Sequence, residues 1–338
     1  MAPLRVFLLV LDAFDPVRLS PRLTPNLWGW SNTDGAVAGT GQSVMASCTY
    51  PNHATFITGQ PPAAHGIYTN HVVRDGKVLG AWEVGPAAPS LFEVLNEHGT
   101  EAVLGDHHLV GVMKARAANR HWPPDGDVTL VDHVDLLGYP SDEAVLPPLL
   151  KALEGDAGLV VGYFGSIDTY SHVYGPASDE AANAYQLVDE KLGIIAGVIK
   201  GRWDDTVLIV VSDHVQDTVA GPGIDLHSAL GDDVLVIDEG SAALISGSVD
   251  TDVLSAIDGV QGWEGHPDGT ILAWCGPGRY FGRSEEPVFL GIHGGNHTRT
   301  QMALVSGGNP ARLPLAAALK EGAVPATFWA NAIKQLML

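Results

Sequence analysis

Cysteine and basic residues are both scarce in this chain. Its two cysteines, Cys48 and Cys275, lie far apart, which excludes a disulfide framework and a zinc finger built on cysteine pairs. Lysine and arginine together number 18 against 39 aspartates and glutamates, so the formal net charge is −21. Nucleic-acid duplexes and anionic membranes are themselves negative and would be repelled. We therefore expect neither as a partner.

Long apolar runs are also missing. The N-terminal segment MAPLRVFLLVLD has one basic residue and no small-residue cleavage site. Its apolar run is too short for a membrane span or for the apolar region of a signal peptide, so we interpret it as a first core strand. We expect a cytoplasmic protein. The sequence leaves the oligomeric state open.

Several common catalytic motifs are absent. The chain has neither a G-x-S-x-G nucleophile elbow nor a G-x-x-x-x-G-K-[ST] phosphate loop. The triplet Gly39-Thr40-Gly41 lacks the third glycine of a dinucleotide fingerprint. The run LVIDE at 235–239 is similar to a Walker B strand, but no Walker A motif accompanies it. We predict an ordinary turn at the triplet and an ordinary strand at LVIDE.

Apolar runs alternate with helical patterns over most of the chain. Hydrophobic residues make up 46% of the sequence, which is ample for a core. The patterns predict strands over 4–11, 102–104, 159–164 and 206–211, and helices over 26–30, 49–59, 90–97, 140–153 and 179–200. This alternation predicts an α/β fold with a mostly parallel sheet flanked by helices on both faces. We expect a single catalytic domain over 1–338, in which 216–290 is an insertion or small subdomain. Within it we predict strands over 233–237, 242–245 and 269–274 and a helix over 250–257.

Acidic residues and histidines follow the predicted strands. VFLLVLD ends on Asp12, LVVGYFGSID ends on Asp168, and VLIVVSDH ends on Asp213 and His214. Ligands gather beyond the carboxyl ends of parallel strands, so we expect these side chains to meet at one edge of the sheet. His172 follows Asp168 in a D-x-x-x-H pattern, which places both on one face of a helical turn. Oxygen and imidazole donors without a thiolate favour Zn²⁺ or a similar divalent ion.

Thr49 lies at the start of the helix predicted over 49–59. Backbone N–H groups and the positive end of the helix dipole lie beside such a residue. Its hydroxyl is a weak nucleophile unless it ionises, and a bound metal would lower its pKa. A threonine at this position is also a common helix cap, so the residues alone leave both roles open.

Six sequence runs match one family's motifs in that family's order. In chain order they are LVLD, TPNLWGW, TYPNHATFITGQPPAAHGIYTN (residues 49–70), SIDTYSHVYGP, VSDH, and GIHGGNHTR followed by LVSGG. Together they resemble the nucleotide pyrophosphatase/phosphodiesterase family of the alkaline phosphatase superfamily. The resemblance spans residues 4–307 and implies an alkaline-phosphatase-like fold.

The resemblance also implies a site with two divalent metal ions, Zn²⁺ by analogy with the family. One ion would be held by Asp168, His172 and His293, and the other by Asp12, Asp213, His214 and the Thr49 oxygen. Thr49 would form a phospho-threonine intermediate, and Asn70 would donate a hydrogen bond to a phosphoryl oxygen. His297 is an alternative to His293 as the last metal ligand. The glycine that follows His293 matches the family's H-G motif and favours His293. Tyr50 and Tyr174 are candidates for contact with substrate.

The implied activity is hydrolysis of a small-molecule phosphate ester, with phosphodiester or nucleotide pyrophosphate bonds as the expected substrates. No lysine or arginine adjoins the nucleophile motif, which favours diesters, although Arg299 lies close to the last ligand. An alternative is a phosphonoacetate-hydrolase-like enzyme, which hydrolyses a carbon–phosphorus bond. That family resembles this chain in every metal motif. Its lysine-rich segment is replaced here by Gly105-Asp106-His107-His108, and the first lysine after this segment is Lys114. The residues also leave open a phosphomonoesterase and a non-catalytic metal-binding relative.

Two positions depart from the family's pattern. The family has D-G after the first strand and D-H-G-M after the later one. This chain has Asp12-Ala13 and Asp213-His214-Val215-Gln216. A side chain in place of each glycine changes how closely these loops can approach the metals, so we expect an effect on substrate access.

Overall fold

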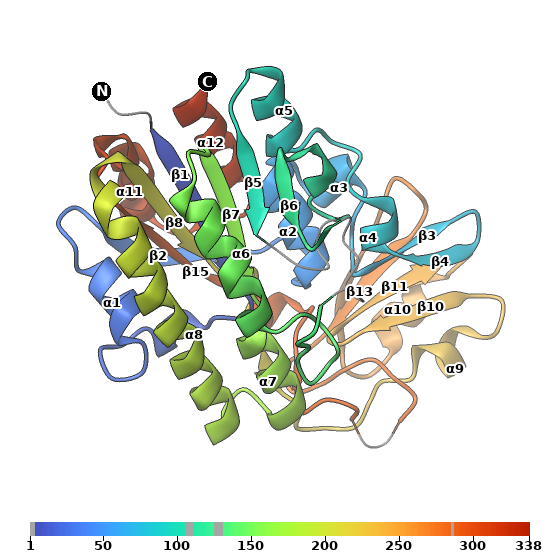
Figure 1. Ribbon diagram of the computed structural model, residues 1–338. Coiled ribbons are helices and arrows are strands. Elements are labelled where there is room, and N and C mark those ends of the chain that lie inside the picture. The colour runs from blue at the N-terminus through green and yellow to red at the C-terminus, as the bar shows by residue number, and fades with distance from the viewer. Residues whose placement is uncertain (1–3, 106–110, 125–130, 285–286) are drawn as a thin grey trace.

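A computed structural model describes residues 4–105, 111–124, 131–284 and 287–338. Figure 1 shows a central sheet with helices on both of its faces and smaller sheets to one side. The strands are β1 (Arg5–Leu11), β2 (Val37–Gln42), β3 (His71–Arg74), β4 (Lys77–Gly80), β5 (Ala102–Gly105), β6 (Arg120–Trp122), β7 (Leu159–Phe164), β8 (Thr206–Val211), β9 (Asp217–Thr218), β10 (Leu235–Glu239), β11 (Ala242–Ser246), β12 (Val260–Gly265), β13 (Ile271–Cys275), β14 (Gly291–Ile292), β15 (Thr300–Ser306) and β16 (Val324–Pro325). The helices are α1 (Pro25–Ser31), α2 (Thr49–Thr58), α3 (Pro62–His65), α4 (Ala81–Val84), α5 (Leu91–Glu97), α6 (Asp142–Glu154), α7 (Ser166–Tyr174), α8 (Asp179–Ile199), α9 (Leu226–Leu230), α10 (Thr251–Ala256), α11 (Leu313–Glu321) and α12 (Phe328–Met337).

The central sheet has eight strands in the order β16-β2-β15-β8-β1-β7-β5-β6. β1 pairs in parallel with both β7 and β8, and β5 pairs in parallel with β7 and β6. β15 is antiparallel to both of its neighbours. Every residue of β1, β7 and β8 is buried, as expected for parallel strands covered on both faces. The predicted α/β fold with a mostly parallel sheet is confirmed.

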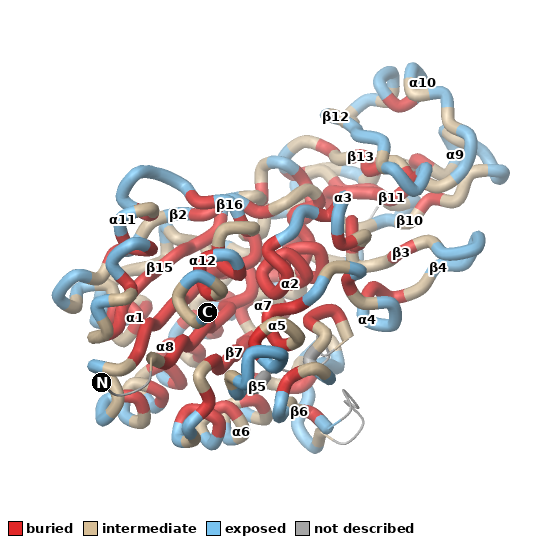
Figure 2. The backbone as a smooth tube through the Cα atoms, turned by 90° about the horizontal axis from the view of Figure 1, so that it is seen from above, coloured by how far each residue is buried: buried red, intermediate tan, exposed pale blue. Residues whose placement is uncertain are grey.

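Two hydrophobic cores lie on the two faces of this sheet. On one face, side chains of α1, α6 and α8 pack against alternate strand residues such as Phe7 and Leu9. On the other, α2, α5, α11 and α12 pack against Val6 and Leu8. Figure 2 shows the central strands and α2 buried along most of their length. Helix α2 is thus held rigidly within the core, and its first residue is Thr49.

A separate antiparallel sheet, in the order β10-β11-β13-β12, lies within the predicted insertion. Its strands β10, β11 and β13 fall where 216–290 was predicted to have them, with bounds shifted by one or two residues. The bounds of the insertion itself stay a prediction. Two short ladders, β3–β4 and β14–β9, complete the structure. Across the described part of the chain, none of the helices has the length and apolar character that a membrane span requires.

One local prediction is wrong. Gly39-Thr40-Gly41 was predicted to be a turn, but it lies in strand β2 and pairs with β15. A side chain at Gly41 would come within 2.8 Å of Oε1 of Gln301, so the glycine allows close packing inside the sheet. The strand predicted at LVIDE is confirmed as β10.

Candidate active site

The carboxyl ends of three neighbouring strands bring the predicted acidic and histidine ligands together. Asp12 directly follows β1, and Asp213 and His214 follow β8 after one residue. Asp168 lies in the first turn of α7, four residues beyond the end of β7. Since β7, β1 and β8 are adjacent and parallel, their ends deliver these side chains to the same edge.

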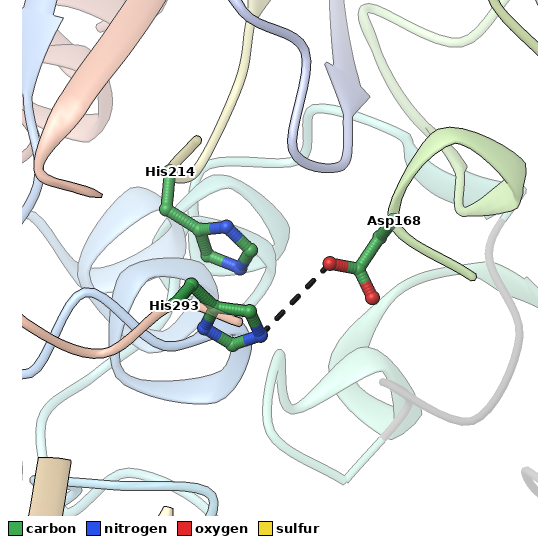
Figure 3. A group of neighbouring side chains, drawn as sticks. All are labelled: Asp168, His214 and His293. Atoms are coloured by element: carbon green, nitrogen blue, oxygen red, sulfur yellow. Dashed lines mark ion pairs between the residues drawn. The ribbon is translucent and has the colours of Figure 1, made fainter. Parts of the chain in front are cut away.

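Five carboxylate and imidazole side chains form two overlapping groups at this edge, and His172 lies beside them through its contact with Asp168. The Nε2 atom of His214 lies 3.4 Å from Oδ1 of Asp12 and 3.4 Å from Oδ2 of Asp213. Two groups could each hold an ion, and in each group the ligand atoms lie within 4.8 Å of one another: Asp12, Asp213 and His214, and Asp168, His214 and His293. Figure 3 shows the second group, with the rings of His214 and His293 stacked 3.8 Å apart. The geometry therefore offers His214 to either ion.

Hydrogen bonds orient two of the histidines. Residues 166–174 form helix α7, so Asp168 and His172 share a face as predicted, with Oδ2 and Nε2 3.3 Å apart. Nδ1 of His172 donates to the carbonyl of Gly291 at 2.7 Å, and Nδ1 of His293 donates to the carbonyl of Ser47 at 3.0 Å. With each Nδ1 engaged in this way, the Nε2 lone pair is left for a metal ion.

The charges of this edge fit bound cations. Burial, reinforced by neighbouring carboxylates, raises the pKa of Asp12 well above its usual value and that of Asp213 to about 7. Burial lowers the pKa of His214 and His293, which keeps both rings neutral. Oδ1 of Asp12, Oδ2 of Asp213 and Nδ1 of His214 are buried without a hydrogen-bond partner. Divalent ions would pair such oxygens and relieve the repulsion between the carboxylates.

Thr49 faces this cluster from the start of α2. Cys48 takes the N-cap position, so Thr49 is the first helical residue and not the cap. Its Oγ1 lies 3.3 Å from Nε2 of His214. The residue is 7% exposed and lines the cavity above the cluster. The structure thus places the predicted nucleophile beside the predicted metal ligands.

Asn70 also lines the cavity. Its Oδ1 accepts a hydrogen bond of 2.9 Å from the backbone N–H of Tyr50. This bond fixes the orientation of the amide, because the opposite orientation would set two donors against each other. The Nδ2 group is therefore the end that can donate to a ligand.

The cavity has a volume of about 250 Å³. Tyr50 lines it, as predicted for a substrate contact, but Tyr174 does not line it and is 40% exposed. His297 lies apart from the cluster, because its Nε2 is 3.3 Å from Oδ2 of Asp217. Further residues of the lining carried no sequence signal: Asp135, Leu137, Tyr139, Asp238, Glu239 and Phe289.

Ala13 occupies the position of the family's glycine after the first strand. Its φ of 57° lies in the left-handed region, where glycine is at ease and alanine is strained. Its backbone N–H donates to Oδ1 of Asp213 at 3.2 Å. The loop thus keeps the glycine-like conformation despite the side chain.

Two further side chains contact the cluster, and sequence reasoning missed both. The hydroxyl of Tyr163 donates to Oδ2 of Asp12 at 2.5 Å. The side chain of Gln216 donates through Nε2 to the carbonyl of Asp168 at 3.0 Å and to its Oδ1. A tyrosine inside a buried strand needs a hydrogen-bond partner, which was the one available signal for Tyr163. Gln216 lies at the position of the family's methionine. This difference from the family's motif was the one sequence signal for it.

We expect Gln216→Ala to lower the affinity for zinc about tenfold or more, because Asp168 loses the partner that orients its carboxylate. Competition with a chromophoric chelator measures this affinity. Gln186→Ala is the matched control, because it removes an exposed glutamine on α8. Equal zinc affinity in wild type and Gln216→Ala would contradict the role.

The protein family described as type I phosphodiesterase / nucleotide pyrophosphatase matches residues 6–258 of this chain. Ectonucleotide pyrophosphatase/phosphodiesterase 1 of Saccharomyces cerevisiae is 26% identical over 282 residues, which are 70% of this chain and 37% of that protein. Ectonucleotide pyrophosphatase/phosphodiesterase family member 7 of Mus musculus is 40% identical over 76 residues, 22% of this chain and 17% of that protein. The matches thus span well under half the length of these relatives.

Solved structures show the same fold. Murine ectonucleotide pyrophosphatase/phosphodiesterase 5, in an inactive form in complex with AMP, superposes with a TM-score of 0.77 at 19% identity, over 99% of this chain and 95% of that one. Phosphonoacetate hydrolase from Sinorhizobium meliloti, in complex with phosphonoacetate, superposes with a TM-score of 0.71 at 17% identity, over 99% and 96% of the two chains.

Proposed function

Since the chain belongs to the type I phosphodiesterase / nucleotide pyrophosphatase family, we propose that it hydrolyses a phosphodiester or nucleotide pyrophosphate bond of a small molecule. The observation that carries this proposal is the Thr49 hydroxyl, 3.3 Å from His214 in a cavity beside both groups of metal-binding side chains. The AMP complex of the murine relative supports a nucleotide as one substrate.

The reaction is proposed to be a double displacement at phosphorus. The Thr49 oxygen attacks, a P–O bond to it forms, and the bond to the leaving-group oxygen breaks, which gives a phospho-threonine. Water then attacks from the side that the leaving group vacated, and Thr49 is released. The Nδ2 group of Asn70 and backbone N–H groups at the start of α2 donate to the phosphoryl oxygens, where negative charge grows.

Two divalent ions are proposed for the site, and the oxygen and imidazole donor set favours Zn²⁺. When bound, they would polarise the phosphoryl oxygens and lower the pKa of the Thr49 hydroxyl. The proposed ligands are Asp168, His172 and His293 for one ion, and Asp12, Asp213, His214 and Thr49 for the other. His172 is included because its Nε2, like that of His293, is the free end of an oriented ring.

A diester is proposed as the preferred substrate over a monoester. Among the described residues, no lysine or arginine lines the cavity, whereas Asp135, Asp238 and Glu239 do. Arg299 was the one candidate cation near the site. It donates through Nε and Nη2 to the backbone carbonyl of Ser43 and does not line the cavity. The second negative charge of a monoester would therefore have no side-chain partner here.

We expect the zinc-loaded protein to hydrolyse bis-p-nitrophenyl phosphate with a kcat/KM about 10- to 100-fold above that for p-nitrophenyl phosphate. Release of p-nitrophenol measures both rates under the same conditions. A kcat/KM for the monoester equal to or above that for the diester would contradict the proposed preference and favour a phosphomonoesterase.

Hydrolysis of a carbon–phosphorus bond is the second candidate, because phosphonoacetate hydrolase shares the fold. Of the segment that replaces its lysines, Asp106, His107 and His108 lie outside the described residues. The Nζ atom of Lys114 lies 2.9 Å from Oε2 of Glu93 and does not line the cavity. Phosphonoacetate is therefore expected to be a poor substrate in the same assay.

Residues 216–290 are proposed to be an insertion that closes one side of the cavity. Asp238, Glu239 and Gly240 contribute to the lining from this segment. The backbone of β9 within it pairs with β14, which immediately precedes His293. The segment would therefore influence both the entrance and the positions of ligands.

A further inference from the structure

The turn between β10 and β11 lies against the cavity. We call its three residues, Glu239, Gly240 and Ser241, the hairpin turn. It begins with the last residue of the run LVIDE, and no residue of this run has a role in the proposed reaction. In Figure 1, β10 and β11 lie beside β3 and β4, the hairpin that follows Asn70. The hairpin turn contacts the site on two sides.

On the first side, Glu239 binds the residue that follows Asn70. Its Oε1 accepts a hydrogen bond of 3.0 Å from the backbone N–H of His71 and one of 2.7 Å from His71 Nδ1. The carbonyl of Asn70 accepts a bond of 2.9 Å from the N–H of Ala81. The backbone on the C-terminal side of Asn70 is thus held at one point by Glu239 of the four-stranded sheet, which we call the small sheet, and at another by the start of α4.

On the second side, the hairpin turn binds the backbone of His293. The N–H of Ser241 donates to the His293 carbonyl at 2.8 Å. Gly240 has a φ of 68°, and a side chain there would lie 2.7 Å from that same carbonyl oxygen. Only glycine permits this close approach. The hairpin turn therefore lies between the residue next to Asn70 and a predicted metal ligand.

Glu239 is buried and makes two specific hydrogen bonds. Its side chain is only 6% exposed, in a cavity that already contains several carboxylates. Burial of one more carboxylate is costly unless hydrogen bonds stabilise it. Both of its bonds go to His71, and charge-assisted bonds of this kind are strong and geometrically specific.

We propose that Glu239 is a positioning residue that holds Asn70, through His71, in the orientation that binds the phosphoryl oxygen. The proposal rests on the proposed function, in which Asn70 donates to that oxygen. Asn70 is held at its side chain by Tyr50, at its carbonyl by Ala81, and at the following N–H by Glu239. His71 is also bonded to Oγ1 of Thr69, through its N–H at 3.3 Å and its carbonyl at 2.8 Å, so loss of Glu239 weakens the restraint on residues 70–71 without removing it. The small sheet would thus contribute to catalysis without touching substrate.

The first test compares two variants of the small sheet in the zinc-loaded protein. Glu239→Ala is expected to lower kcat for bis-p-nitrophenyl phosphate about 10- to 100-fold with KM nearly unchanged, because a hydrogen bond to the transition state is misplaced. Glu264→Ala removes an exposed glutamate from β12 of the same sheet and is expected to leave kcat unchanged. Glu239→Gln keeps an acceptor for the His71 N–H and is expected to restore most of the activity. Equal kcat in Glu239→Ala and Glu264→Ala would overturn the proposal.

A double-mutant cycle separates positioning from general damage to the fold. If Glu239 acts through Asn70, Glu239→Ala has little further effect on kcat once Asn70 is alanine. Equal loss of kcat on Glu239→Ala in the wild-type and Asn70→Ala backgrounds would overturn the proposal. His71→Ala is expected to lower kcat less than Glu239→Ala, because the backbone N–H still donates to Glu239.

Failure of the proposed function has a different signature. If the wild-type protein hydrolyses none of the three phosphorus compounds above, the proposed function fails, and kcat carries no information on Glu239. The cycle is then measured as the dissociation constant of orthovanadate, which imitates the phosphoryl group, by calorimetry on the zinc-loaded protein. A weakening of vanadate binding by Glu239→Ala that disappears in the Asn70→Ala background supports positioning. Additive weakening contradicts it.

Discussion

Replacement of Thr49 by alanine is expected to reduce kcat for bis-p-nitrophenyl phosphate by about 10³-fold or more while two zinc ions stay bound. The hydroxyl belongs to the first residue of a fully buried helix and lies 3.3 Å from Nε2 of His214, whereas the hydroxyl of Tyr163 is engaged with Oδ2 of Asp12. The remaining ligands do not depend on it, because they come from α7 and from the residues that follow β1, β8 and β14. Initial rates and the zinc content per chain, measured on the same preparation, test both halves of the statement.

Thr49→Ser is the matched control for this prediction. Serine keeps the oxygen at the same position of α2 and loses only a methyl group, so it is expected to retain a measurable part of the activity. A Thr49→Ala protein that turns over substrate at the wild-type rate would remove the phospho-threonine from the account. Loss of zinc together with loss of activity would mean that Thr49 serves the metal and not the phosphorus.

Removal of metal is expected to destabilise the protein by about 4 kcal/mol relative to zinc at a thousandfold excess over its dissociation constant. The carboxylates of Asp12, Asp168 and Asp213 lie close together, and burial raises the pKa of Asp12 and Asp213. Without cations these groups repel one another, and Oδ1 of Asp12 and Oδ2 of Asp213 have no hydrogen-bond partner. Thermal unfolding with and without chelator is expected to differ by roughly 5–10 °C in the midpoint.

The variant Asp213→Asn tests the origin of that difference. It removes one predicted ligand charge, so zinc is expected to raise its unfolding midpoint much less than that of the wild type. Asp233→Asn changes an exposed aspartate and is expected to behave like the wild type. An equal zinc effect on the two variants would show that the metal stabilises the protein from another place.

The sequence predicted the elements that bury a whole apolar run. Strands β7 and β8 have the predicted bounds, 159–164 and 206–211, because every residue in each of them is buried and no polar residue interrupts the run. The carboxyl ends of these strands and of β1 allowed us to predict the sheet edge at which Asp12, Asp213 and His214 meet. The spacing of Asp168 and His172 predicted a shared face if this segment is helical, and α7 supplies the helix.

Contacts between distant segments could not be predicted in the same way. Strand β2 contains glycine, threonine and glutamine, and β15 has only a short apolar run between polar residues, so their pairing in the folded sheet defines them. The bond between Gln216 and Asp168 and the bonds between Glu239 and His71 join residues far apart in the chain. A single sequence contains no local signal for such pairs. The position of His214 between both candidate groups likewise depends on the three-dimensional arrangement.

The central claim is that side chains from separate strand ends hold two divalent ions beside Thr49. Anomalous X-ray diffraction at the zinc absorption edge, from crystals of the zinc-loaded protein, tests this claim most directly. Two strong peaks are expected, one among Asp12, Asp213 and His214, and one at Asp168 and His293. A map without peaks at this edge of the sheet, or with zinc bound only elsewhere on the surface, would contradict it.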